Sequence, residues 1–183
     1  MFSLGSALKG NLAAVGYNRR IPSGGHMPNI LFVCTGNMHR SPIAAAVFQR
    51  DLSRNLDDRS DWQVLSAGTW ATADLPAEER TRRFAEKLGL DLSQHRSQRI
   101  DENLLANADL VVVMESGHKE ALGVEFPKYK DRVVLLSELI PGPAFDLPDP
   151  DLVRLEKFNQ KLSEVVVLVE KAHAALCAAA RGS

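Results

Sequence analysis

A cysteine, a glycine and an arginine stand close together in one short segment, Cys34-Thr35-Gly36-Asn37-Met38-His39-Arg40-Ser41-Pro42. A loop that curls into a helix N-terminus turns successive backbone N–H groups inward and forms a concave site for an anion. Gly36 allows such a backbone, and Arg40 offers a planar pair of donors for two oxygens of a phosphoryl group. The amides, the helix dipole and Arg40 would all favour the thiolate of Cys34. The segment therefore predicts binding of a tetrahedral dianion and attack on it by Cys34, with the Ser41 hydroxyl stabilising the thiolate as a leaving group.

A plainer interpretation is that Cys34 is a small buried residue at the end of a strand, as free cysteine usually is. The flanking residues decide between the two. Ile30–Val33 is a continuous apolar run, which suits a strand buried on both faces of a parallel sheet. Ser41-Pro42 is a typical helix start, with Ser as the N-cap and Pro at the first helical position. This agreement between motif and context favours the catalytic interpretation.

Cleavage of a phosphate ester also needs a general acid for the leaving oxygen. A loop with four prolines near the end of the chain supplies three candidate carboxylates, those of Asp146, Asp149 and Asp151. Asp149 lies between Pro148 and Pro150, which restrict its placement, yet aspartate is also an ordinary turn residue. The residues alone leave the choice among the three open.

Apolar runs and turn residues predict strands and helices that alternate along the chain. The expected strands are 30–33, 63–67, 110–114 and 132–136, and the expected helices are 41–54, 76–88 (with Gly89 as its stop), 116–122 and 151–179. The last helix is expected to bury one stripe, formed by Leu152, Leu155, Phe158, Leu162, Val165 and Val169. The alternation predicts a single-domain α/β protein with a parallel sheet and helices on both faces. Cys34 would then lie at the carboxyl edge of that sheet, where such folds place their active sites.

Composition limits the function classes. The chain has 183 residues and a formal net charge of -1, which gives no field to attract nucleic acid. Its apolar runs are far shorter than the roughly 20 residues of a membrane helix, so no membrane insertion is expected. Two cysteines are too few for a disulfide scaffold and favour a reducing, cytoplasmic location. Residues 1–27 are expected to be a disordered or expression-derived leader, 28–179 the domain and 180–183 a tail.

Taken together, these motifs resemble the low-molecular-weight protein tyrosine phosphatases. The matching segments occur in one order over residues 28–175, and they are Phe32–Asn37, Arg40–Pro42, Ser66–Thr69, His95–Ser97, Ala108–Met114 and Asp149-Pro150. The resemblance implies a flavodoxin-like four-stranded parallel sheet. It also implies a two-step hydrolysis through a phosphocysteine intermediate, without a metal or an organic cofactor.

The resemblance assigns a role to each matching residue. Cys34 would attack phosphorus, Arg40 would bind the phosphoryl oxygens, and Ser41 would assist the thiolate. Asp149 would protonate the leaving group and then deprotonate water, which settles the choice among the aspartates. The phosphate-binding loop would consist of Thr35, Gly36, Asn37, Met38, His39 and Ser41, with Asn37 shaping it through hydrogen bonds.

The sequence departs from the family pattern at two places. His39 stands where many members carry a second cysteine that can trap the nucleophile in a disulfide, and Asp151-Leu152 stands where aromatic residues usually wall the substrate slot. Trp70 is the candidate for a replacement wall, with partial core burial as the alternative. Cys177 is expected to be a packing residue. Among the histidines, His39 is expected to be a structural or surface group, His95 a structural contact, and His118 and His173 ordinary helix-face residues, with no metal site among them.

The sequence is compatible with more than one substrate and more than one function. The expected partner is a phosphotyrosine protein or a small phosphomonoester. Phosphotyrosine is preferred over phosphoarginine because arginine-phosphate phosphatases carry threonine at the position of Met38, and an apolar side chain suits an aryl ester better. The alternatives are a small-molecule (sugar) phosphatase and a non-catalytic phosphate-binding or phosphotyrosine-binding module. An arsenate reductase is less favoured, because it would need further cysteines. The sequence predicts no oligomeric state.

Overall fold

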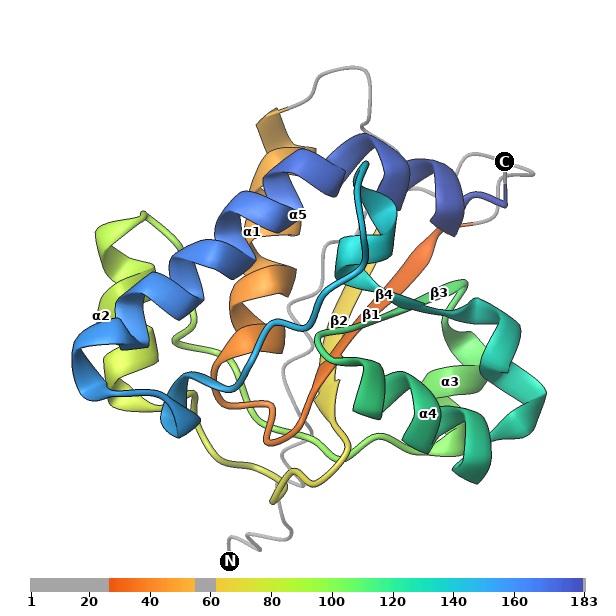
Figure 1. Cartoon of the computed structure of the whole chain (residues 1–183), viewed down its shortest axis with the longest axis horizontal. Coiled ribbons are helices and arrows are strands. Elements are labelled where there is room, and N and C mark those ends of the chain that lie inside the picture. Colours follow the sequence, from red (N-terminus) through yellow and green to blue (C-terminus); the bar gives the residue numbers. More distant parts are fainter. Residues whose placement is uncertain (1–26, 55–61, 183) are drawn as a thin grey trace, which may run out of the picture.

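Residues 27–54 and 62–182 are described by a computed structural model, in which helices cover both faces of a four-stranded sheet (Figure 1). Residues 1–26 of the predicted leader lie outside the described residues. The strands are β1 (Asn29–Cys34), β2 (Gln63–Gly68), β3 (Leu110–Val113) and β4 (Val133–Leu135). Their order is β2-β1-β3-β4 and every pairing is parallel. The predicted four-stranded parallel sheet with helices on both faces is confirmed.

Strand β1 runs through the middle of the molecule between two hydrophobic cores. Its side chains alternate between the faces of the sheet: Ile30 and Phe32 pack in the core under α1 and α5, whereas Leu31 and Val33 pack in the core under α3 and α4. All six residues of β1 are buried, as the continuous apolar run predicts. Cys34, at the carboxyl end of this inner strand, therefore lies near the middle of the row formed by the carboxyl ends of the four strands.

The helices are α1 (Arg40–Arg54), α2 (Glu79–Lys87), α3 (Glu102–Asn107), α4 (Ser116–Glu125) and α5 (Phe158–Ala180). The prediction that the second helix starts at Pro76 is wrong, because the Glu78 carboxylate caps the helix by accepting the N–H of Arg80 at 2.8 Å. Gly89 ends it in the left-handed region, with φ of 68°, as predicted. Helix α1 starts at Arg40, so the prediction of Ser41 as its N-cap is wrong too.

Helix α5 is shorter at its start than the sequence predicts. Instead of a helix from residue 151, the chain forms two short 3₁₀ turns, η4 (Pro150–Leu152) and η5 (Leu155–Lys157). Leu152 is 83% exposed and Leu155 is 69% exposed, so the predicted buried stripe is wrong at these two positions. It is confirmed from Phe158 onward. The physical reason is local: the Asp149 carboxylate accepts the N–H of Asp151 and closes a tight turn instead of a helix.

Helix α3 is missing from the prediction. It has six residues, too few for a 3.6-residue period to be recognised, and it is held by the Asp101 carboxylate, which accepts the N–H of Leu104 at 2.8 Å. The remaining connections include the 3₁₀ turns η2 (Pro127–Arg132) and η3 (Leu136–Leu139). Among the described helices, none combines the length and the apolar character needed to cross a membrane.

Candidate active site

The segment 34–41, called the Cys34 loop below, leads from the carboxyl end of β1 into the first turn of α1 (Figure 1). Two of its side chains are almost inaccessible to solvent: Cys34 is 2% exposed and Arg40 is 1% exposed. Ser41, the last residue of the loop, places its hydroxyl oxygen 3.0 Å from Cys34 Sγ. The loop thus brings a thiol, a hydroxyl and a guanidinium group together at a helix N-terminus, where the backbone dipole favours negative charge.

Asn37 holds the Cys34 loop in its shape. Its φ of 56° lies in the left-handed region that asparagine tolerates better than most residues. Its side-chain amide nitrogen donates to the hydroxyls of Ser41 and Ser66, each at 2.9 Å. Its side-chain oxygen accepts the backbone N–H of Gln98, also at 2.9 Å. All of these bonds are made by a side chain with no solvent exposure, so the orientation of Ser41 toward the thiol depends on Asn37.

The end of β2 lies directly against the Cys34 loop. A Cβ atom on Gly68 would lie 2.9 Å from the backbone nitrogen of Asn37 and still closer to the carbonyl oxygen of Thr35. That carbonyl accepts the backbone N–H of Trp70 at 2.9 Å. His95 Nε2 donates to the carbonyl of Asn37 at 2.8 Å, as expected of a structural contact. Only glycine permits this approach, and the loop is therefore fixed from the β2 side as well.

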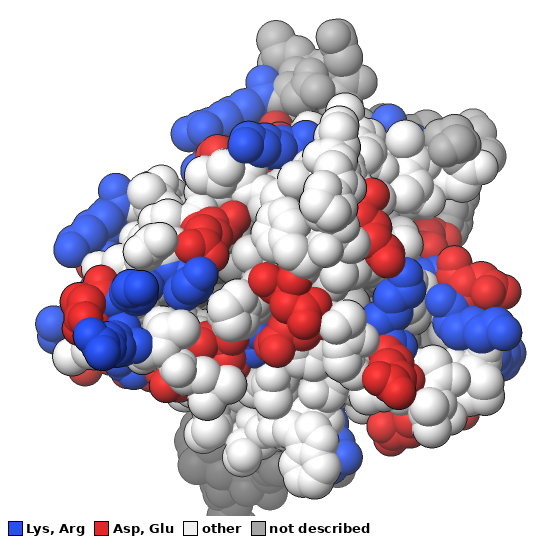
Figure 2. Space-filling model, in the orientation of Figure 1, with Lys and Arg blue, Asp and Glu red and all other residues white. Residues whose placement is uncertain are grey.

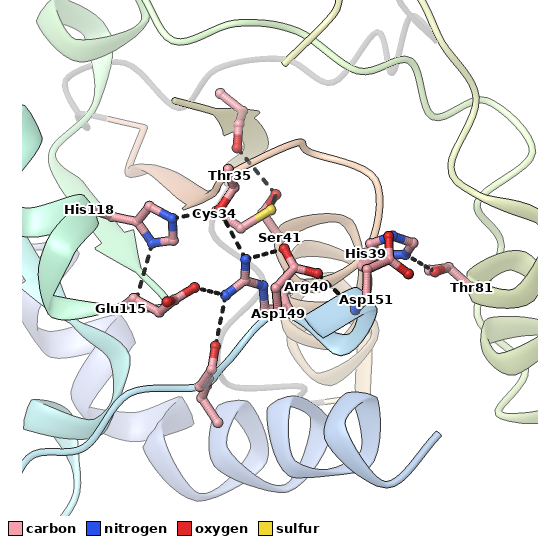
Figure 3. A network of polar contacts seen from close by, with 12 residues as sticks. Cys34, Thr35, His39, Arg40, Ser41, Thr81, Glu115, His118, Asp149 and Asp151 are labelled. Atoms are coloured by element: carbon pink, nitrogen blue, oxygen red, sulfur yellow. Dashed lines mark hydrogen bonds and ion pairs between the residues drawn. The ribbon is translucent and has the colours of Figure 1, made fainter. Parts of the chain in front are cut away.

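Arg40 is bound on both of its terminal nitrogens (Figure 3). One nitrogen donates to the Glu115 carboxylate and, at 2.8 Å, to the carbonyl of Leu147. The other donates to Asp149 Oδ2 at 2.5 Å and to the hydroxyl of Thr35 at 3.1 Å. The guanidinium plane is thereby fixed between two carboxylates at the mouth of the loop.

The charges around Arg40 keep it protonated. Burial by itself would lower the pKa of Arg40, but the negative charges of Cys34, Asp149 and Glu115 more than offset this and raise its pKa above the ordinary value. A permanently charged guanidinium group beside Cys34 and an incoming dianion stabilises both.

The sequence leaves three aspartates open, and the structure separates them. Asp149 contacts Arg40, and its side chain is 19% exposed, so it lies at the edge of solvent. Asp146 instead accepts the N–H and the hydroxyl of Ser116, at 2.7 and 3.0 Å, and so caps helix α4. Asp151 contacts the buried side chain of His39. The position of Asp149 agrees with the role that the family resemblance implies for it.

His118 is not the ordinary helix-face residue that the sequence predicts. It is buried, accepts the backbone N–H of Glu115 on Nδ1 at 3.2 Å, and lies with Nε2 3.0 Å from the hydroxyl oxygen of Thr35. Burial lowers the pKa of His118, and the charge of Arg40 lowers it further. A neutral ring that accepts on Nδ1 must donate from Nε2, so His118 and Arg40 both donate to Thr35.

His39 is a structural group rather than a surface group. Its side chain is buried, with Nδ1 2.6 Å from the Thr81 hydroxyl and Nε2 2.9 Å from Asp151 Oδ2. His39, Asp149 and Asp151 each offer one ligand atom within 4.8 Å of one another. Arg40 already binds Asp149, and Arg80 binds Asp151, so guanidinium groups neutralise both carboxylates and we assign no metal to this cluster.

The candidate wall residue Trp70 is 78% exposed, not buried in the core. Its backbone is bonded to the Cys34 loop through Thr35, and the guanidinium carbon of Arg99 lies 5.6 Å from the centre of its ring. Met38 is half-buried in the same loop. Two apolar side chains are therefore available beside the site, although neither follows Pro150.

Cys177 belongs to the last turn of α5. That end of α5 lies at the opposite end of the sheet from the Cys34 loop (Figure 1). Both Cys34 and Cys177 are buried thiols, and Cys177 packs in the core as predicted. His173, one turn earlier on the same helix, is half-buried, with its ring centre 5.2 Å from that of Phe48.

Residues 29–181 match the family model described as low molecular weight phosphotyrosine protein phosphatase. The chain belongs to this family. The resemblance predicted from the sequence is therefore confirmed, together with the phosphatase class.

Individual members of the low molecular weight phosphatase family show how far the similarity extends. The chain is 32% identical over 136 residues to the probable low molecular weight protein-tyrosine-phosphatase EpsP of Ralstonia nicotianae, and this match covers 74% of this chain and 87% of the relative. It is 32% identical over 145 residues to the protein-arginine-phosphatase of Bacillus subtilis, and this match covers 78% of this chain and 93% of the relative. The structure of the tyrosine phosphatase Wzb from Escherichia coli K30 in complex with sulphate superposes with a TM-score of 0.72 at 30% identity, over 82% of this chain and 99% of that one.

Glu115 is the site residue for which the sequence analysis gave no role. It directly follows Met114, the last residue of the predicted strand 110–114. Since the sites of parallel sheets gather at strand carboxyl ends, this position was a usable signal. His118 lies inside α4, about one helical turn further on, and nothing in its sequence position indicates that it belongs to the site.

Proposed function

We propose that this protein is a cysteine-dependent protein-tyrosine phosphatase that acts through a phosphocysteine intermediate. The observation that supports the proposal most strongly is the meeting of Cys34, Ser41, Arg40 and Asp149 at the carboxyl end of β1. These four groups provide a nucleophile, a partner for its thiolate, a phosphoryl clamp and an acid. Two buried thiols without a disulfide suit a reducing compartment, and we propose a cytoplasmic location.

In the first step, the Cys34 thiolate attacks phosphorus. The S–P bond forms as the ester P–O bond breaks, and the leaving phenolic oxygen takes a proton from Asp149. In the second step, water attacks phosphorus and gives a proton to Asp149. The S–P bond then breaks, Cys34 leaves as a thiolate that the Ser41 hydroxyl stabilises, and inorganic phosphate is released.

Arg40 connects substrate binding to the state of the acid. A substrate dianion must compete with the Asp149 carboxylate for the guanidinium nitrogen that Asp149 binds at 2.5 Å. A protonated Asp149 has no net charge and binds Arg40 more weakly. Binding of the dianion to Arg40 and protonation of Asp149 therefore favour each other, and the acid is loaded when the substrate is in place.

A second candidate substrate is phosphoarginine, because a relative from Geobacillus stearothermophilus, like the one from Bacillus subtilis, is named a protein-arginine-phosphatase. We favour the aryl ester, because Met38 and the exposed ring of Trp70 offer apolar contacts beside the loop. Sugar phosphates and binding without turnover stay as alternatives for the same site.

The test is steady-state hydrolysis of an aryl phosphate, a phosphotyrosine peptide, a phosphoarginine peptide and a sugar phosphate by the full chain under reducing conditions. Cys34→Ser should abolish turnover, and the matched variant Cys177→Ser should leave it unchanged. Activity that persists in a chelator would agree with cysteine chemistry. Phosphotyrosine binding without turnover would instead support a binding module, and loss of turnover in folded Cys177→Ser would support a redox enzyme.

A further inference from the structure

The two places at which the sequence departs from its family pattern contact each other. His39 Nε2 lies 2.9 Å from Asp151 Oδ2, although the residues are 112 positions apart in the chain. The His39 side chain is 8% exposed and the Asp151 side chain is 49% exposed. The buried histidine of the Cys34 loop, His39, is therefore paired with Asp151 on the turn that follows Asp149.

His39 is held rigidly. Its second ring nitrogen lies 2.6 Å from the hydroxyl of Thr81, a fully buried residue of α2. Its ring packs edge-on against Phe158 at the start of α5, with centroids 5.4 Å apart and an angle of 88° between the planes. With the ring fixed on two sides, Nε2 is directed at Asp151 (Figure 3).

The second carboxylate oxygen of Asp151 is bound as well. Oδ1 accepts a hydrogen bond from Arg80 of α2 at 2.9 Å. The Arg80 guanidinium carbon lies 4.4 Å above the ring of Phe158, and its Nε pairs with Glu78 at 3.3 Å. Figure 2 shows Lys and Arg side chains gathered on the side of the molecule where α2 lies. Asp151 thus connects the turn to the Cys34 loop through one oxygen and to α2 through the other.

Asp151 also touches the proposed acid directly. Its backbone N–H donates to Asp149 Oδ1 at 3.0 Å, whereas Asp149 Oδ2 binds Arg40. Pro150, between the two aspartates, is buried, but Leu152, the residue after Asp151, is 83% exposed. The Asp151 side chain is therefore anchored through both of its oxygens, while its backbone N–H is bonded to the Asp149 carboxylate.

We propose that Asp151 is a positioning residue for Asp149 and acts through His39 and Arg80. The inference rests on the proposed function, in which Asp149 is the general acid. Exposed ion pairs contribute little on their own, so the bond to buried His39 should matter more than the bond to Arg80. In this chain a polar contact with the Cys34 loop replaces the aromatic residue that relatives are expected to carry after Asp-Pro.

The experiment measures kcat/KM for a series of aryl phosphates whose leaving groups range from good to poor. The variants are Asp149→Asn, Asp151→Ala, Arg80→Ala, His39→Ala and His39→Gln, and the matched control is Glu156→Ala, which removes an exposed carboxylate from the neighbouring turn η5. A displaced acid should slow poor leaving groups by up to about a hundredfold and good ones by only about threefold. Inhibition by inorganic phosphate is measured in each variant to show that the Cys34 loop is intact.

The proposal expects Asp151→Ala to reproduce, more weakly, the leaving-group dependence of Asp149→Asn, with phosphate inhibition unchanged. Arg80→Ala should have the smaller effect, and His39→Gln should retain more activity than His39→Ala, because the Gln amide keeps an N–H donor close to the place of Nε2. A steep dependence in Asp149→Asn together with none in Asp151→Ala would overturn the positioning role and leave the proposed function standing. If the wild-type protein has no turnover, or if Asp149→Asn shows the same leaving-group dependence as the wild type, both the positioning role and the proposed function are overturned.

Discussion

The hydroxyl oxygen of Ser41 lies 3.0 Å from Cys34 Sγ and 3.2 Å from the carbonyl oxygen of Ala67. Asn37 donates to the same oxygen, so the hydroxyl keeps its place while its proton turns either toward Ala67 or toward sulfur. A thiolate attracts that proton. Ser41 can therefore stabilise the Cys34 thiolate before it attacks phosphorus and again when it leaves phosphorus in the second step.

The first prediction concerns this hydroxyl. Ser41→Ala should slow breakdown of the phosphocysteine, because a hydrogen bond to a charged group contributes about 1.5 to 3 kcal/mol, or about tenfold to a hundredfold in rate. Rapid-quench kinetics should then show a burst of phenol followed by slow turnover. Ser53→Ala is the matched control, since Ser53 lies exposed on the same helix and bonds a backbone carbonyl. A Ser41 variant without a burst and with normal turnover would contradict the assignment.

Asn37 leads to a second prediction. Asn37→Ala should lower the free energy of unfolding by about 2 to 4 kcal/mol, because buried hydrogen-bond partners lose their donor and a left-handed backbone loses a tolerant residue. Urea denaturation measures the loss. Asp74 also has a left-handed φ, of 65°, but its side chain is exposed and makes only a 4.0 Å ion pair with Arg96. Exposed ion pairs contribute little, so Asp74→Ala should show little more than the backbone cost of about 1 to 2 kcal/mol. Equal losses in the two variants would mean that the bonds made by Asn37 contribute nothing.

The third prediction tests the close approach of β2 to the Cys34 loop. A Cβ on Gly68 would meet the backbone of Thr35 and Asn37, and backbone atoms cannot move aside as a side chain can. Gly68→Ala should therefore lose about 1 to 3 kcal/mol of stability and most of its phosphate affinity. Nothing lies within 4 Å of a Cβ placed on Gly123, so Gly123→Ala should be neutral or stabilising by up to about 1 kcal/mol. Phosphate affinity is measured by titration of the folded Gly68→Ala variant. An affinity equal to that of the wild type would show that the Cys34 loop adapts to the added methyl group.

A fourth prediction concerns pH. Burial lowers the pKa of His95, and the charge of Arg96 lowers it further, against the opposing effect of the Asn37 carbonyl. The folded pKa therefore lies below the ordinary value of 6.5. The stability that His95 contributes is then fully present above pH 6.5 and is lost as pH falls through the folded pKa.

The measurement compares unfolding free energies at several pH values between 7.5 and 5 for the wild type and His95→Gln. The Gln amide can donate to the Asn37 carbonyl but does not titrate, so the variant should lose less stability on acidification. A loss as large as that of the wild type would assign the pH dependence to other groups, among them His118, whose pKa burial also lowers.

Much of the fold follows from local signals in the sequence. Ile30–Val33 has no polar residue and must be buried on both faces, so the central strand and the loop after it could be placed correctly. The end of α2 followed from Gly89 in the same way. The start of α5 could not be placed in this way, because Leu152 and Leu155 have helical spacing but stay 83% and 69% exposed in the folded chain.

The network around Arg40 was harder to predict. Glu115 lies 75 positions from Arg40, and His118 lies 83 positions from Thr35. Their contacts depend on the register of β3 beside β1, and no local pattern encodes this register. The contact between His39 and Asp151 likewise depends on how α2 and the turn after Asp149 pack together.

The last prediction concerns the substrate wall. The ring of Trp70 is 78% exposed although its backbone is bonded to the Cys34 loop through Thr35. An exposed indole is costly to solvate and suits stacking against a phenyl ring, a contact of about 0.5 to 1.5 kcal/mol. Trp70→Ala should therefore raise KM for aryl phosphates about threefold to tenfold, and Trp70→Phe should restore most of the loss. Inhibition by inorganic phosphate, which has no ring, should be the same in all three proteins. If alkyl and aryl phosphates lose affinity equally in Trp70→Ala, the ring supports the Cys34 loop instead of contacting the substrate, and Met38 becomes the wall residue to test.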